Sequence, residues 1–406
     1  MSSTFSWLDY SEYDRRKMLD VIELFGERDT RDELGLGSVR DAFADQLFPG
    51  TSTIQTRARY FLLVPWIYQF LEEHATPSSS IAEKARKCEV RLIHGLCKSD
   101  DTNGVIGKQA KENLLRLPSN VYWSGLGAWG IRTFPGSQEQ YHRSLDQLYL
   151  RRKGRQVSRR EYEGESETDG DLHNWHAGLP PRPHNFTDEA VLSLNFNEAD
   201  YLSLQIQTNC PKSLMAFLVR ERWDVSNFNY AWELREGLPQ SLREILDHAE
   251  NFSHTINGAQ LLYNLLLARK RQHSEWIDDY KNRLHEWWIG IEERDQGIRT
   301  WQRDHFWQIV AAGNSRVSHR SKVFINTWID ILLSTKTLNQ LLDHANAAKL
   351  IEEREQQLKR GLARLTNQQA LEHWGGDAGS RQLDLRWPVS RNILTDILAG
   401  WEAGDA

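Results

Sequence analysis

Cysteine is scarce in this sequence, which contains only three among its 406 residues. So few cysteines exclude a disulfide-stapled scaffold and favour a reducing compartment. Cys88 and Cys97 lie nine residues apart, and on a helix this spacing places them on opposite faces. The pair therefore does not suit a metal ion, and we expect the protein to have neither a metal site nor a cofactor.

A long apolar run is also missing. No stretch approaches the roughly 20 consecutive apolar residues that a membrane span needs. The opening MSSTFSWLDYSEYDRRK lacks the apolar core of a signal peptide. We therefore expect a soluble, cytoplasmic protein that makes no contact with a membrane.

Neither sign of charge is in large excess. Fifty basic residues against 56 acidic ones give a formal net charge of −6 at pH 7. A net field of this sign does not attract nucleic acid or anionic lipid. Contact with nucleic acid would therefore need a local basic patch.

Aromatic residues, in contrast, are plentiful, with 16 Trp, 14 Phe and 12 Tyr. Their large flat side chains bury much area, and we interpret them as core between helices rather than as a stacking surface for bases. Apolar residues recur at helical spacing through most of the chain, and no run of alternating strands, internal repeat or sustained heptad is present. The sequence therefore predicts an all-α fold, an irregular multi-helix bundle.

Helical periodicity stops between residues 154 and 186. The stretch RQVSRREYEGESETDGDLHNWHAGLPPRPHNF is basic, then acidic, then rich in proline, which is typical of a linker or a long surface loop. Its histidines occur without cysteine or regular spacing, so we do not interpret them as a zinc site. The prediction is two helical halves joined by this segment, with an N-terminal domain at 1–153 and a C-terminal domain at 187–406.

The stretch GTSTIQTRARYFLLVPW is a candidate anion site. Thr51, Ser52 and Thr53 can cap a helix whose free N–H groups favour an anion. Arg57 lies one turn further in, and Arg59 follows it. Such a helix end suits a phosphate of DNA, RNA or a nucleotide. The alternative is that the hydroxyls only cap the helix while the arginines pair with nearby carboxylates, because caps are far commoner than anion sites.

A second basic cluster lies where the first half ends. Arg151, Arg152 and Arg155 are its main members, with Lys153 between them. We predict an accessory nucleic-acid surface here. The alternative is a solvated helix end, because the acidic run that follows cancels much of the field.

No catalytic motif is recognisable. Residues 104–108 lack the spacing of a phosphate loop, and no HExxH pattern occurs. Residues 109–131 allow a helix-turn-helix, but the second helix carries mostly Tyr, Trp, Leu and Gly, which indicates a core helix rather than a recognition helix. An enzyme with an unrecognised helical active site, acting on nucleic acid or a nucleotide, remains the alternative to a binding protein.

Four stretches together resemble an uncharacterised bacterial family that has only a domain-of-unknown-function label. They are WLDYSEYDRRKMLDVIELF, FPGTSTIQTRARYFLLVPWIY, LPSNVYWSGLGAWGI and WHAGLPPRPHNF, and the resemblance covers nearly the whole chain. It implies an accessory protein of gene clusters linked to defence against phage or foreign DNA, near helicase-like and phospholipase-D-like genes. It implies no catalytic residues.

These observations lead us to expect an accessory, non-enzymatic adaptor or a nucleic-acid-associated component of a bacterial defence-type gene cluster. The expected partner is a protein encoded nearby, for which a helicase-type protein is one candidate. Nucleic acid is a second candidate ligand.

Overall fold

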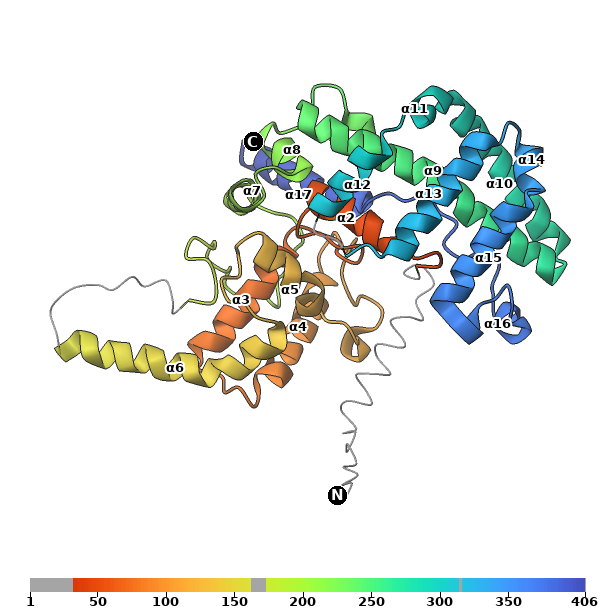
Figure 1. The fold of residues 1–406 in the computed structure, drawn as a ribbon. Coiled ribbons are helices and arrows are strands. Elements are labelled where there is room, and N and C mark those ends of the chain that lie inside the picture. The colour runs from red at the N-terminus through yellow and green to blue at the C-terminus, as the bar shows by residue number, and fades with distance from the viewer. Residues whose placement is uncertain (1–31, 162–172, 314–315, 406) are drawn as a thin grey trace, which may run out of the picture. The chain divides into compact units, whose positions relative to one another are not determined.

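The structure is a computed structural model that describes residues 32–161, 173–313 and 316–405. In these ranges the secondary structure is helical, and no strand occurs (Figure 1). The one isolated bridge in this part of the chain pairs Arg132 with Trp175. The predicted all-α fold is confirmed. The helix expected near Ser11–Asp14 lies outside the described residues.

Sixteen α-helices and three short 3-10 helices make up this helical structure within the described ranges. They are α2 (Gly37–Leu47), α3 (Tyr60–Glu73), α4 (Ile81–Leu96), η1 (Lys111–Asn113), α5 (Pro118–Ala128), α6 (Gln138–Glu161), α7 (Phe196–Asn209), α8 (Leu214–Arg220), η3 (Ala231–Leu234), α9 (Gln240–Arg271), α10 (Ser274–Glu293), α11 (Asp295–Arg299), α12 (Arg303–Ala312), α13 (His319–Ser334), α14 (Leu338–Leu342), α15 (Ala345–Lys359), η4 (Arg360–Leu362), α16 (Gln368–Glu372) and α17 (Trp387–Asp405). None of those in the described part is long and apolar enough to cross a membrane.

The chain forms two compact units, and each combines stretches that are far apart in the sequence. Of the described residues, the first unit contains those up to Phe43 and those within Arg243–Leu385, and the second contains those within Ala44–Leu242 and those from Arg386 onward. The predicted linker at 154–186 is only partly described, so the predicted division into domains on either side of it stays a prediction.

Aromatic side chains fill the core of the second unit. Phe61 of α3 stacks on Trp129 with ring centroids 3.8 Å apart and meets the edge of Tyr122 at 4.9 Å. All three rings are buried. Tyr122 belongs to α5, which confirms the interpretation of this segment as a core helix. Residues 109–117 contain only the short turn η1 rather than a first recognition-type helix.

The core of the first unit is organised around α9, which runs unbroken past Gly258. Two indoles donate hydrogen bonds to consecutive carbonyls of this helix. Trp287 Nε1 of α10 reaches the carbonyl of His254 at 2.7 Å, and Trp328 Nε1 of α13 reaches that of Thr255 at 2.8 Å. A Cβ on Gly258 would lie 2.1 Å from the Trp287 ring, so the missing side chain is what lets the two helices approach.

We expect Gly258→Ala to destabilise the first unit even though alanine is the better helix former. Replacing glycine in a helix gains at most about 1 kcal/mol. Overpacking against the Trp287 ring costs ~1–3 kcal/mol, so we expect a net decrease in the free energy of unfolding. The matched control is Gly290→Ala in α10, where nothing lies within 4 Å of the added Cβ and a gain of ~0.5–1 kcal/mol is expected. Urea unfolding measures both; stabilisation by Gly258→Ala would contradict this packing.

Candidate functional site

The predicted anion site at 51–59 is a loop that precedes α3 rather than the first turn of a helix. α3 begins at Tyr60, and its N-cap residue Arg59 makes no side-chain capping bond. The hydroxyls of residues 51–53 therefore do not cap this helix, which begins three residues after Arg57 rather than one turn before it. Thr53 is exposed.

Side chains within the loop satisfy its backbone instead. The Thr51 hydroxyl donates to the carbonyl of Phe48 at 2.7 Å. The Gln55 amide donates to the carbonyl of Gly50 at 3.1 Å and accepts from the backbone N–H of Ser52 at 3.2 Å. The Ser52 hydroxyl oxygen is buried and has no hydrogen-bond partner in the described part of the chain. Hydrogen bonds from Thr51 and Gln55 thus hold the backbone of the loop in place.

Arg57 connects this loop to the last helix of the unit. Its Nε lies 2.9 and 3.0 Å from the two carboxylate oxygens of Asp396 in α17, and the N–H of Ala58 donates to the same carboxylate at 2.8 Å. Its Nη1 reaches Asp101 at 2.6 Å. Burial raises the pKa of the Asp396 carboxyl and outweighs the opposing effect of Arg57. Ionisation of the Asp396 carboxyl therefore depends on its pair with Arg57.

Arg59 makes a second internal ion pair. Its guanidinium is buried, and Nη2 donates to Glu198 Oε1 of α7 at 2.7 Å. Nη1 donates to the carbonyl of Val191 at 3.1 Å. The alternative that Arg57 and Arg59 pair with carboxylates is therefore confirmed. Anion binding by residues 51–59 stays a prediction.

The second predicted cluster lies on α6, which extends to Glu161 and not only to Lys153 as the sequence predicted. The glycine at 154 does not end the helix, because one glycine costs only about 1 kcal/mol and its basic and Gln neighbours are good helix formers. Arg151 and Lys153 are exposed. The side chain of Arg155 lies outside the described residues.

Arg152 has a structural contact that the sequence did not indicate. Its Nη2 pairs with the buried carboxylate of Glu72 at 2.8 Å. Tyr141 and Trp175 donate to the other oxygen of that carboxylate at 2.6 and 3.0 Å. Glu72 lies in the last turn of α3 while Arg59 precedes its first, about 20 Å apart along the helix axis. The structure therefore does not bring the two predicted clusters together.

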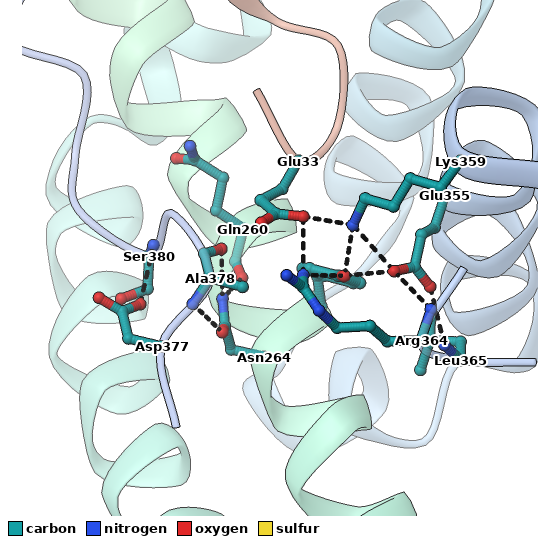
Figure 2. A network of polar contacts seen from close by, with 11 residues as sticks. Glu33, Gln260, Asn264, Glu355, Lys359, Arg364, Leu365, Asp377, Ala378 and Ser380 are labelled. Atoms are coloured by element: carbon teal, nitrogen blue, oxygen red, sulfur yellow. Dashed lines mark hydrogen bonds and ion pairs between the residues drawn. The ribbon is translucent and has the colours of Figure 1, made fainter. Parts of the chain in front are cut away.

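A buried network of charged groups in the first unit was not predicted (Figure 2). It contains two carboxylates, one ammonium, one guanidinium and one phenol, which belong to Glu33, Glu355, Lys359, Arg364 and Tyr263. Lys359 pairs with Glu355 at 2.9 Å and also with Glu33. Arg364 Nη1 pairs with Glu33 at 2.8 Å. The two negative and two positive charges balance.

The Glu355 carboxylate is held in its charged form by its neighbours in this network. Burial acts to raise the pKa of Glu355, but Lys359 and the hydrogen bonds that the carboxylate accepts outweigh it, so the pKa lies below its ordinary value. One of those bonds comes from the N–H of Leu365 at 2.8 Å. Of these contacts, only the Glu355–Lys359 spacing of four residues is visible in the sequence. The network fastens residue 33 to α15.

An open cavity of the first unit, with a volume of about 460 Å³, lies beside α10, α11 and α13. Its carboxylates already have partners. Glu292 accepts from Trp288 Nε1 at 2.6 Å, and Asp295 pairs with Arg299 at 2.7 Å. No group of three or more potential metal ligands occurs within the described residues.

Removing Arg57 tests whether its pair with Asp396 is structural. We expect Arg57→Ala to lower the free energy of unfolding by about 3–5 kcal/mol, because a largely buried carboxylate loses its partner. The matched control is Arg91→Ala, which removes an exposed pair with Asp188 and should change stability little. Urea denaturation compares the two variants. Equal and small losses would show that the Arg57 pair does not hold the unit together.

Comparison with known proteins shows the family. The model described as a family of unknown function (DUF6361) matches residues 1–400. No curated protein and no solved structure matches the chain. The match spans nearly the whole sequence and confirms the resemblance to an uncharacterised family. The chain belongs to the DUF6361 family of unknown function.

Proposed function

We propose that this protein is an accessory, non-enzymatic and cytoplasmic adaptor that associates with nucleic acid in a bacterial defence-type gene cluster. The observation that supports the proposal most directly is the exposure of two basic residues on α6. Arg151 and Lys153 face solvent there, so their charges are available to a ligand. The proposal therefore places the nucleic-acid contact on this helix.

The exposed basic residues of α6 suit a phosphate backbone for an electrostatic reason. Nucleic-acid affinity comes largely from basic groups that neutralise phosphates and release counterions. A guanidinium and an ammonium on one helix provide this without reading bases, so the proposed contact is sequence-independent.

The predicted residues at 51–59 are a weaker choice for this contact. Arg57 and Arg59 each bind a carboxylate, so a phosphate would have to displace an internal partner. Breaking a buried ion pair leaves an uncompensated charge and costs several kcal/mol. We therefore assign these arginines to the framework and the ligand contact to α6.

The protein partner in this proposal is a helicase-type protein encoded nearby. This element comes from the resemblance and from the gene neighbourhood it implies. An adaptor of this kind would hold nucleic acid with one surface while a different surface docks on the partner.

The double variant Arg151→Ala/Lys153→Ala tests the proposed contact. We expect weaker binding of a labelled DNA duplex in fluorescence anisotropy, and a slope of log K against log salt that is smaller by about 2, because two phosphate contacts are lost. The control is Lys84→Ala/Lys87→Ala on α4, which removes the same charge from another exposed helix of this unit.

Equal effects of the two double variants would show a response to net charge and overturn the assignment to α6. Unchanged binding in both would exclude nucleic-acid contact through this helix. Breakdown of the DNA, or release of phosphate from an added nucleotide, would favour the enzyme alternative.

A further inference from the structure

A small pocket of the first unit lies between the start of α13 and the middle of α15. Its volume is about 170 Å³. Three basic side chains line it, two from α13 and one from α15, and these are His319, Arg320 and Arg354. Glu353, which is exposed and pairs with Lys349 at 3.8 Å, contributes the single carboxylate of the lining. The lining is therefore cationic in a protein whose net charge is negative.

Arg354 carries a buried charge at this pocket without a carboxylate partner. It is only 4% exposed. Its guanidinium donates to three neutral acceptors, the carbonyls of Leu34 and Gly35 at 2.8 and 3.1 Å and the Ser321 hydroxyl at 2.8 Å. Within the described residues no carboxylate lies at ion-pair distance. A buried charge costs free energy unless it is paired, so an anion bound at this position would stabilise the folded protein.

The charges around Arg354 do not already neutralise its guanidinium. Burial lowers the pKa of the Arg354 guanidinium, and the positive charge of Arg320 lowers it further. The nearby carboxylate of Asp32 opposes this effect. Asp32 is itself held by the backbone N–H groups of Leu36 and Gly37, each at 2.6 Å, so it does not approach the guanidinium as a partner.

The start of α13 adds a second source of positive potential. The first N–H groups of a helix lack partners within it and form the positive end of the helix dipole. Acidic side chains normally occupy such a start, but α13 has none in its first turn and begins with His319 and Arg320. The positive charge of Arg320 is unfavourable beside this positive end of the dipole. An anion bound there would offset that repulsion.

We propose that this pocket binds a phosphate group. Guanidinium groups bind phosphate through paired N–H donors, and a helix start adds backbone donors of the same sign. The volume exceeds the ~30 Å³ share of one water molecule but falls short of the ~300–1,000 Å³ typical of sites for whole drug-sized ligands. It therefore takes one phosphate group rather than a whole nucleotide. The pocket belongs to the first unit and α6 to the second, and this proposal does not depend on the proposed nucleic-acid contact.

Thermal unfolding of the full chain in a titration with inorganic phosphate, at constant ionic strength set with chloride, tests the pocket. We expect the Tm to rise with phosphate concentration, because a ligand that binds the folded state stabilises it. Arg320→Gln, an exposed substitution that leaves the fold intact, should weaken the apparent affinity about tenfold or more, since a charged donor is lost. Lys281→Gln, which removes an exposed charge from α10, should leave the Tm shift unchanged.

Arg354→Gln is the stronger variant and should abolish the shift; if it does not fold, Arg320→Gln still decides the question. No rise of Tm with phosphate, an equal rise with added chloride, or an unchanged shift in Arg320→Gln would each overturn the proposal. Ribose 5-phosphate separates the sources of the group. A larger shift than with inorganic phosphate indicates a phosphate on an organic carrier, and an equal or smaller shift indicates the free ion.

Discussion

Pairing of buried charge across distant parts of the sequence is the interaction on which both units depend. In the second unit Arg57 and Asp396 join residues that are 339 positions apart, and their contact attaches α17 to the loop before α3. In the first unit the pairs of Glu33 with Lys359 and Arg364 attach the earliest described segment to α15 and the turn that follows it. Because each unit consists of separated stretches, such contacts join the stretches of one unit. Each also fixes a register, since a buried charge cannot move away from its partner without a large cost.

Local features of the fold could be predicted from the sequence, and long-range ones could not. Helical spacing of apolar residues predicted the all-α fold, and the aromatic residues are core, as at Phe61 and Trp129. The predictions that were wrong took a glycine or a hydroxyl residue as the boundary of a helix. Gly154 does not end α6, and Thr51 bonds within its own loop instead of capping α3. The partners of Arg57 and Arg59 lie in α17 and α7, and no local pattern indicates which distant carboxylate an arginine will meet. For the same reason, the sequence did not indicate the network of charged groups around Tyr263.

Five arginines of this protein fall into two groups that the sequence does not separate. Arg57, Arg59 and Arg152 neutralise carboxylates inside the second unit. Arg151 on α6 and Arg320 at the start of α13 are exposed. Of these five, only Arg151 and Arg320 can exchange water for an external anion without breaking an internal ion pair. This difference supports a binding role in which the core is a rigid support and exposed basic side chains make contact with ligands.

Co-purification from the native host distinguishes a protein that binds nucleic acid and a protein partner from one that catalyses a reaction. The tagged full chain is recovered from lysates with and without nuclease treatment, and both nucleic acid and proteins in the eluate are measured. We predict nucleic acid in the untreated eluate and a protein partner that persists after nuclease treatment. Recovery of neither would contradict the account and return the enzyme alternative to first place.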